Sequence, residues 1–330
     1  MLCFPRRIAV SRVLEINNLT VKDGKGYILK DISLSLDSNE TTAFIGESGS
    51  GKTMTLKAIL SILPSDVEKV EGDVLIDGTE LYNLKKDEKR IKLGTTVGFV
   101  PQNTVNYLHP LLRIKDQMTD GYITFHGRKK KEEALDKARK GLEEVGIKDV
   151  ERVLSSYPSE LSGGMKQRVN IASALMMDPS LLISDEPTSA LDKVVQKQVA
   201  SLYLSLLEKN KVALLVVSHD LVFVERIADK IAVFYAGEIV ESGRKEEIFS
   251  SPIHPYTKAL MALKPSMLLD KTRPLEEIKG YISEEDRNKE GCVFSSRCPK
   301  CRKECMERVE ERKVSDTHRV KCILSDGRTQ

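Results

Sequence analysis

GESGSGKT, residues 46–53, stands between the short apolar run TTAFI and the helix-forming run MTLKAIL. Its spacing, G-x-x-x-x-G-K-[ST], is that of a loop whose backbone N–H groups wrap a phosphate. In such a loop the lysine, here Lys52, reaches the β- and γ-phosphates, and the hydroxyl after it, here Thr53, can hold Mg²⁺. A strand, this loop and a helix in succession predict an α/β fold. The residues expected around the phosphates are Gly46, Glu47, Ser48, Gly49, Ser50, Gly51, Lys52 and Thr53.

The chain around this loop alternates between strand and helix patterns. Residues 12–100 are predicted to form strands and turns, with an Asp-Gly hairpin signal in DVLIDGTEL. From Arg113 to about Met177 the recurrence of apolar residues at three- and four-residue steps predicts helices. The later runs LLISDEP, VALLVVSHD and KIAVFYAGEIV are apolar and are separated by helical patterns, as in a buried parallel sheet.

Length and composition exclude several classes of protein. The 330 residues exceed one typical domain and predict a large domain with an appendage. The 52 basic and 49 acidic residues nearly balance, so the dense basic surface of a dedicated nucleic-acid binder is not expected. No apolar run approaches the roughly 18–20 residues of a membrane span, and the start lacks a secretory pattern. We therefore expect a cytosolic protein whose six cysteines are free thiols or metal ligands.

An acidic pair ends the apolar run LLISDEP. Asp185 is expected at the carboxyl end of a buried strand, where a carboxylate can hold Mg²⁺. Glu186 follows directly and can polarise an attacking water. Such a pair is commonly just a helix cap or a turn when it stands alone. A phosphate-binding loop in the same chain favours the catalytic interpretation.

Three further features are weaker signals when taken singly. LSGGMKQR, residues 161–168, opens a predicted helix with two adjacent glycines and so offers backbone N–H groups to a second anion. Gln102 follows the predicted strand in VGFVPQN, where a loop amide is unremarkable. His219 ends the run VALLVVS, where a histidine is usually structural.

Together these motifs resemble those of the ATP-binding subunit of an ATP-binding-cassette (ABC) transporter, over about residues 12–265. The resemblance implies an α/β P-loop NTPase fold with a RecA-like core, an antiparallel β subdomain and a helical subdomain. It also implies that Thr53, Gln102 and Asp185 surround Mg²⁺, that Glu186 is the general base and that His219 contacts the γ-phosphate of ATP. The matching motifs, in the family's order, are GESGSGKT, Gln102, LSGGMKQR, LLISDEP, SALD (Ser189–Asp192) and His219.

The resemblance explains why the chain has two anion-binding helix starts. In ABC proteins two nucleotide-binding domains dimerise head to tail, and each signature helix caps the ATP held by the other subunit. Ser162, Gly163 and Gly164 are thus expected at a partner's nucleotide. Met165 stands where many members have Gln, and it is not interpreted as inactivating because neighbouring backbone groups make the contacts. Tyr27 is the nearest candidate for the adenine-stacking aromatic, and a packing role is the alternative.

Further motifs narrow the resemblance to one subgroup of the family, the ATPases of oligopeptide, dipeptide and nickel importers. YPSELSGGMKQR, PQNTVNYLHP, SPIHPYTKAL and the tail GCVFSSRCP…HRVKC carry it. The phosphate loop and SGGM look more like the first of the two paired ATPases in those systems. The implied organisation is an ATP-binding domain over 12–252, with a helical subdomain at about 103–177, and a C-terminal extension with a cysteine cluster over 253–330.

The implied protein is a peripheral subunit at the cytoplasmic face of the cell membrane. It is expected to hydrolyse ATP and to drive uptake of di- or oligopeptides through separate integral-membrane permease subunits. Its dimer partner is expected to be a paralogous ATPase, an extracellular solute-binding protein takes part indirectly, and no nucleic acid is involved. Nickel and oligosaccharide stay open as solutes. The rival interpretation is a soluble ABC ATPase of translation or DNA repair, but those carry two cassettes or long coiled-coil or zinc insertions.

The tail resembles that of family members whose cysteines hold an iron–sulfur cluster. The matching positions are Cys292, Cys298, Cys305 and Cys322. A [4Fe–4S] cluster is the leading expectation; zinc, which suits the C-P-K-C made with Cys301, and metal-free thiols are the alternatives. The charged tail needs such a staple because it cannot bury much apolar core alone. His318 is expected at the surface or beside a metal ligand, and Cys3 has no partner in the sequence.

Overall fold

The structure is a computed structural model that describes residues 12–102, 107–189, 193–263, 278 and 280–326. Its larger sheet carries the phosphate-binding loop. In spatial order the strands of that sheet are β11 (Arg312–Lys313), β12 (Arg319–Val320), β10 (Glu238–Arg244), β9 (Lys230–Tyr235), β3 (Thr41–Ile45), β8 (Ala213–Val217), β7 (Leu181–Asp185) and β6 (Val97–Val100). Strands β6, β7, β8, β3 and β9 pair in parallel. The buried parallel sheet predicted from the apolar runs is confirmed, except that the end of KIAVFYAGEIV lies in β10, which is antiparallel to β9.

The centre of this sheet is covered on both faces. Every residue of β3, β7 and β8 is buried, and alternate residues along each strand face two different cores. In β3, Ala43 and Ile45 face one core and Phe44 faces the other. The side chains that pack into these cores are apolar on both faces of the sheet, as is usual for strands that helices or sheets cover on each side.

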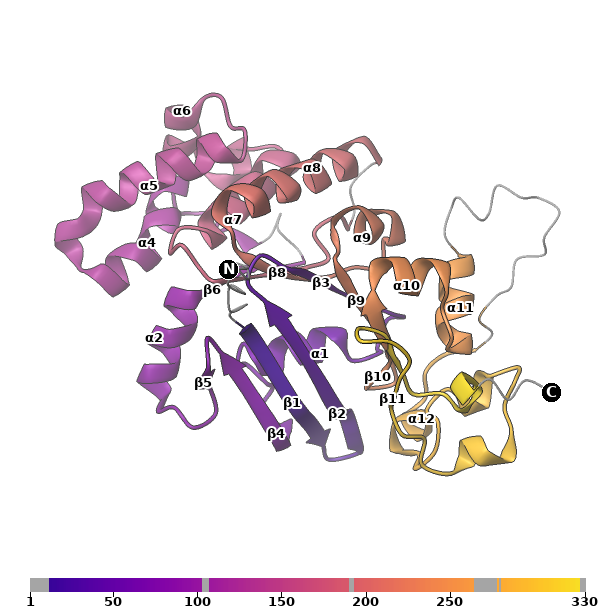
Figure 1. The fold of residues 1–330 in the computed structure, drawn as a ribbon. Coiled ribbons are helices and arrows are strands. Elements are labelled where there is room, and N and C mark those ends of the chain that lie inside the picture. The colour runs from indigo at the N-terminus through magenta and orange to yellow at the C-terminus, as the bar shows by residue number, and fades with distance from the viewer. Residues whose placement is uncertain (1–11, 103–106, 190–192, 264–277, 279, 327–330) are drawn as a thin grey trace, which may run out of the picture.

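A second sheet is antiparallel and lies beside the first (Figure 1). Its strands, in spatial order, are β2 (Gly26–Asp37), β1 (Arg12–Asp23), β4 (Glu68–Ile76) and β5 (Thr79–Glu80). Asp77 and Gly78 join β4 to β5 with positive φ angles of 46° and 70°, the requirement of a tight type I′ hairpin turn. The hairpin predicted from the Asp-Gly pair is confirmed.

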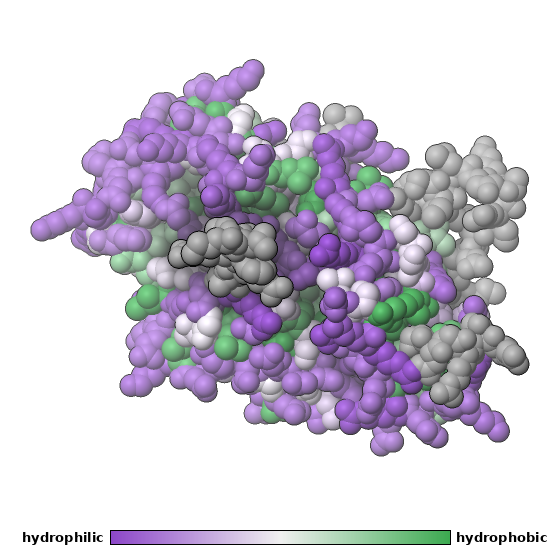
Figure 2. Space-filling view, viewed as in Figure 1, coloured by the Kyte–Doolittle hydropathy of each residue, from purple (hydrophilic) through white to green (hydrophobic). Residues whose placement is uncertain are grey.

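Helices gather at one end of the molecule (Figure 1). They are α4 (Ile114–His126), α5 (Lys131–Glu144), α6 (Val150–Ser155) and α7 (Gly163–Ala174). Helix α5 buries Ala134, Ala138 and Leu142 and leaves its charged face to solvent, as its periodicity predicts. Figure 2 shows the mostly hydrophilic surface that results around these helices.

The remaining helices flank the sheets or follow them. They are α1 (Lys52–Ile59), α2 (Lys86–Thr96), α8 (Lys193–Asn210), α9 (Leu221–Ile227), α10 (Lys245–Ser250), α11 (Pro255–Ala262) and α12 (Glu284–Asn288). Helix α2 corrects the prediction of strands and turns for residues 12–100, where a helix is expected only after the phosphate-binding loop. No residue of α2 is buried, so its sequence has no apolar period from which a helix could be predicted.

The C-terminal segment packs against the core. Strand β12 extends the larger sheet by pairing with β10, where Glu241 lies opposite Val320. The ring of Phe294 lies 5.1 Å from that of Tyr235 in β9. His318 is buried, and its Nε2 lies 2.7 Å from Oε1 of the buried Glu241, so the surface position expected for it is wrong.

No helix in the described part of the chain has the length and hydropathy that crossing a membrane requires.

Candidate nucleotide-binding site

The phosphate-binding loop joins β3 to α1, as its sequence predicts. Gly46 has a φ of +145°, and a Cβ there would lie 2.2 Å from the carbonyl oxygen of Phe234 in β9. At Gly51, with a φ of +113°, a Cβ would lie 2.8 Å from a side-chain carbon of Leu29. The loop needs glycine at both positions, because any larger residue would collide with the strands behind it.

Lys52 folds back over the loop. Its Nζ donates to the carbonyl oxygens of Gly46 and Glu47, both at 2.8 Å, and to Oγ of Ser50 at 3.2 Å. Burial lowers the pKa of Lys52 to about 8, although the nearby carboxylates of Glu186 and Asp185 act in the opposite direction. The ammonium group is therefore held inside the loop, where it can meet a phosphate.

Asp185 ends β7 beside this lysine. Burial, and to a lesser extent the charge of Glu186, raises the pKa of Asp185 to about 6. Its Oδ1 is buried and has no hydrogen-bond partner among the described residues. A buried carboxylate oxygen without a partner is costly unless a cation completes it, and carboxylate oxygen is a preferred ligand of Mg²⁺. Thr53, the second residue of α1, is exposed and available to the same cation.

Glu186 brings two other predicted residues together. Its Oε2 accepts a hydrogen bond of 2.9 Å from Nε2 of Gln102, and its Oε1 lies 3.2 Å from Nδ1 of His219. The three residues follow β6, β7 and β8, which are neighbours in the sheet. Glu186 also has a left-handed backbone, with a φ of +47°. Such strain in a residue other than glycine is typical of functional positions.

The signature segment, residues 161–168, reaches the neighbourhood of this cluster through Gln167, whose Nε2 donates to the carbonyl oxygen of Pro187, the residue after Glu186. Ser162 caps α7, since its Oγ accepts a hydrogen bond of 3.3 Å from the Met165 N–H. A Cβ built on Gly164 would meet nothing within 4 Å. Within the ranges that the structure describes, no hydrogen bond joins Ser162, Gly163 or Gly164 to the phosphate-binding loop. The helix start is open on the side where a partner's nucleotide is expected.

Tyr27 lies on β2 and is half-buried. The Nζ of Lys22 lies 4.1 Å from the centre of its ring, and its backbone N–H donates to Oδ1 of Asn288 in α12 at 3.0 Å. Its role as the adenine platform stays a prediction. Of the SALD element, Ala190–Asp192 lie outside the described residues, as does Cys3.

Sequence reasoning missed a set of contacts between the C-terminal segment and the phosphate-binding loop. Arg297 forms an ion pair of 2.8 Å with Glu47, and Arg287 donates to the carbonyl oxygen of Gly49 at 3.0 Å. The hydroxyl of Tyr256 accepts a hydrogen bond of 2.8 Å from the Glu47 N–H. No local pattern signals these contacts, because they join residues more than 200 positions apart.

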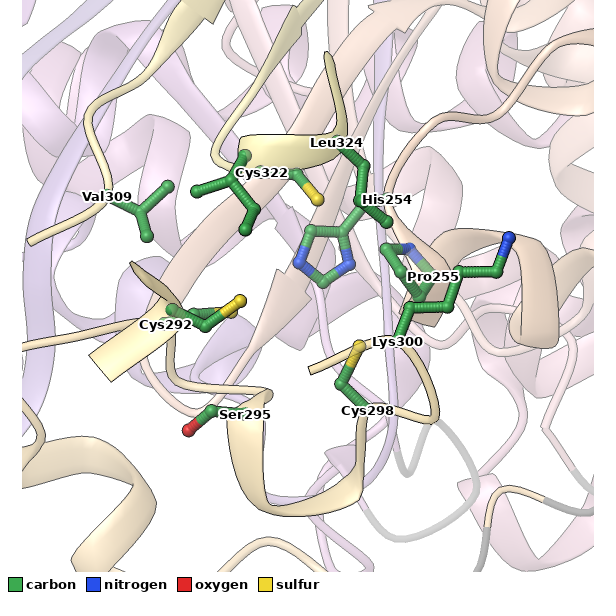
Figure 3. A pocket seen from close by; sticks show the side chains of 11 residues that line it. His254, Pro255, Cys292, Ser295, Cys298, Lys300, Val309, Cys322 and Leu324 are labelled. Atoms are coloured by element: carbon green, nitrogen blue, oxygen red, sulfur yellow. The ribbon is translucent and has the colours of Figure 1, made fainter. Parts of the chain in front are cut away.

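The four cysteines predicted as ligands line one pocket together with His254 (Figure 3). The five cysteines in the described residues, Cys301 among them, form no disulfide with one another. Burial raises the pKa of Cys292 to about 12, and the neighbouring thiols add to this effect. Within the described ranges, no three histidine, cysteine or carboxylate side chains lie close enough to form a preformed metal site.

An ATP-binding cassette is the class that this fold and cluster define. Residues 29–189 match the model of the ABC transporter family, and residues 240–305 match that of the oligopeptide/dipeptide transporter C-terminal region. The chain is 37% identical to the oligopeptide transport ATP-binding protein OppD of Bacillus subtilis, over 96% of this chain and 90% of OppD. It is 35% identical to the dipeptide transport ATP-binding protein DppD of the same organism, over 97% of each chain.

A solved structure shows the same fold. The ATP-binding cassette MJ0796, a dimer in a post-hydrolysis state bound to ADP and Pi, superposes with a TM-score of 0.62 at 29% identity. The match covers 70% of this chain and 98% of that one. The chain belongs to the ABC transporter family, among the ATP-binding subunits that carry the oligopeptide/dipeptide transporter C-terminal region. It is therefore an ABC-type ATPase.

Proposed function

We propose that this chain is the ATP-hydrolysing subunit of an importer for di- or oligopeptides. The observation that carries the proposal is the convergence of Gln102, Glu186 and His219 beside a complete phosphate-binding loop. The peptide assignment is supported by similarity to OppD and DppD over nearly the whole chain. The chain would work at the cytoplasmic face of the membrane with separate permease subunits, and an extracellular solute-binding protein would deliver the solute.

The chain's own residues suit the binding of Mg-ATP. The loop N–H groups and Lys52 would hold the phosphates, and Thr53, Gln102 and Asp185 would hold Mg²⁺. When bound, the ion neutralises charge that develops on the phosphates. The partnerless Oδ1 of Asp185 is the observation that fits such an ion. Gln102 already donates through its Nε2 to Glu186, which leaves its amide oxygen as the ligand.

Glu186 would orient and deprotonate the attacking water. The Gln102 amide at 2.9 Å and the His219 ring at 3.2 Å fix its carboxylate from two sides. The His219 side chain is 65% exposed, so it can turn toward a γ-phosphate without a buried contact being broken. Ser162, Gly163 and Gly164 would complete the site from a second ATPase subunit, and we propose a paralogue for that role.

A surface for the permease lies just after Gln102. Tyr107, Leu111 and Leu112 are 60%, 78% and 47% exposed. Gln117 fixes the turn that carries them, because its Oε1 accepts from the His109 N–H at 2.8 Å and its Nε2 donates to the Leu112 carbonyl at 2.8 Å. A rigid turn that displays apolar side chains to solvent is typical of a protein interface.

Peptide uptake tests the proposed function. Cells that produce this chain with its permease are expected to take up a labelled dipeptide or oligopeptide, and cells with the Lys52→Ala variant are expected to lose that uptake. Uptake of peptide that is unaffected by Lys52→Ala, together with loss of nickel or oligosaccharide uptake, would reassign the solute.

The Leu111→Asp variant should separate hydrolysis from transport. A charge on the exposed apolar turn should weaken docking to the permease, so we expect peptide uptake to fall by about tenfold, the effect of roughly 1.4 kcal/mol lost at an interface. ATP hydrolysis by the isolated subunit should stay unchanged. Val70→Asp, at an exposed position of β4 that is 47% accessible, is the matched control and should leave uptake intact. Equal uptake by both variants would show that the turn is not part of the permease interface.

We further propose that the tail holds a [4Fe–4S] cluster on Cys292, Cys298, Cys305 and Cys322. The position of His254 in the cysteine pocket supports such a cluster. Its Nδ1 accepts a hydrogen bond of 3.1 Å from the Tyr256 N–H, so the neutral ring carries its proton on Nε2. That Nε2 is buried without a partner among the described residues, and the ring lies among the cysteine sulfurs (Figure 3). Anionic sulfur would accept a hydrogen bond from this N–H group.

The number and type of the ligands support a cluster. Four cysteines line one pocket, and four thiolates are the usual ligand set of a [4Fe–4S] cluster. A single zinc ion on cysteine thiolates is the alternative.

The metal content of purified protein decides between these cofactors. Protein purified without oxygen should be brown, with broad absorption near about 400 nm from iron–thiolate charge transfer. Cys298→Ser should lose the iron, whereas the matched control Cys301→Ala should keep it. Stoichiometric zinc without iron in the anaerobic protein would refute the cluster.

A further inference from the structure

We propose that the cysteine-rich tail is part of the nucleotide site, in which Arg297 and α12 position the phosphate-binding loop and the strand of Tyr27. The affinity for ATP then depends on tail residues that never touch the nucleotide. The inference builds on the nucleotide site proposed above.

Arg297 clamps the first turn of the loop. Its two terminal nitrogens donate to the two carboxylate oxygens of Glu47 at 2.8 and 3.1 Å. The same guanidinium donates to the Tyr235 hydroxyl at 3.2 Å and to the Ile278 and Gly280 carbonyl oxygens at 2.9 and 3.1 Å. Its side chain is only 7% exposed. A bidentate ion pair that is this well buried and supported fixes the orientation of both partners.

Helix α12 contacts both halves of the predicted nucleotide site through two consecutive residues. Arg287 donates to the Gly49 carbonyl oxygen at 3.0 Å. The next residue, Asn288, accepts from the Tyr27 N–H at 3.0 Å. Gly26 allows this approach, because a Cβ there would lie 2.2 Å from Oδ1 of Asn288. The loop and the strand of the predicted adenine platform are thus tied to one short helix.

Aromatic rings connect this clamp to the cysteine pocket. The Tyr256 hydroxyl accepts from the Glu47 N–H, and its ring lies 5.4 Å from that of Phe294. Phe294 stands between Cys292 and Cys298 in the chain, and Arg297 immediately precedes Cys298. Whatever folds the cysteine segment therefore also places the guanidinium on Glu47. By linkage, nucleotide binding and the folding of the tail should stabilise each other.

The Arg297→Ala variant tests the proposal in the full-length protein. The dissociation constant for ATP, measured by calorimetry, should rise by about tenfold, in line with the loss of a charge-assisted pair. KM should rise with it, whereas kcat should change little, because the positioning acts on bound ATP and its transition state alike. Arg297→Lys should restore part of the affinity. Arg319→Ala, which removes an exposed arginine paired only with Glu311 in the described ion pairs, is the matched control.

A double-mutant cycle distinguishes the clamp from general damage to the tail. If the pair acts as a unit, Arg297→Ala combined with Glu47→Gln should bind ATP no more weakly than the worse single variant. Independent additive losses, or wild-type affinity in Arg297→Ala, would overturn the inference. A wild-type protein that binds no ATP would instead count against the proposed function itself.

Discussion

The Glu186→Gln variant is expected to hydrolyse ATP about 10²–10⁴ times more slowly than the wild type, the usual contribution of a general base. Glutamine has nearly the same shape, and its amide oxygen can still accept the hydrogen bond from Gln102. It cannot take a proton from water at neutral pH. ATP should therefore bind as before, because Lys52 and the loop N–H groups are untouched, and only the chemical step should slow.

Phosphate release and equilibrium ATP binding, measured on the same preparation, check this prediction. Glu246→Gln, which neutralises an exposed carboxylate in the first turn of α10, is the control and should hydrolyse ATP normally. Turnover near wild type in Glu186→Gln would show that another group takes the proton. His219 would then be the first candidate, since its ring lies 3.2 Å from Glu186.

Mixing two inactive variants should restore activity if this chain forms homodimers whose nucleotide sites are shared between the two subunits. Lys52→Ala removes the cation that meets the phosphates, and Gly164→Asp places a negative charge where the partner's γ-phosphate is expected. Each variant alone should lose nearly all turnover. In a random one-to-one mixture, half of the dimers are mixed and each holds one intact site, so about a quarter of wild-type activity should return.

Gly121→Asp is the matched control for the signature variant. Gly121 lies in α4, and a Cβ there also meets nothing within 4 Å, so the substitution adds the same charge to an open helix position. It should leave hydrolysis unchanged. If the mixture stays inactive and a paralogous ATPase restores turnover, the functional dimer is a heterodimer of this chain and the paralogue. Activity from a strict monomer would contradict a shared site.

Much of the nucleotide site could be predicted because its residues lie at the ends of buried strands. Gln102, Glu186 and His219 each follow an apolar run, and parallel strands bring their carboxyl ends to one edge of the sheet. The phosphate-binding loop could be predicted from the spacing of its own residues alone. Helix α2 could not be predicted, since it buries no residue and has no apolar period.

Contacts across long sequence separations escaped prediction for a different reason. Glu47 and Arg297 are 250 positions apart, and each alone is an unremarkable charged residue. The sequence predicts His318 at the surface or beside a metal ligand, but the fold buries it against Glu241. The order in which strands join a sheet decides such pairings, and that order is a property of the whole chain.

The pairing of β12 with β10 also has a consequence for self-association. Strand β12 pairs with Glu241 and Ser242 of β10, so without the tail the backbone groups at these two residues would form an unpaired sheet edge. The tail replaces that edge with β11, which is two residues long, exposed and made of Arg312 and Lys313. Short, positively charged edge strands resist pairing with another chain. A protein truncated before β11 would thus expose an unpaired sheet edge and tend to aggregate, even where its ATPase core still folds.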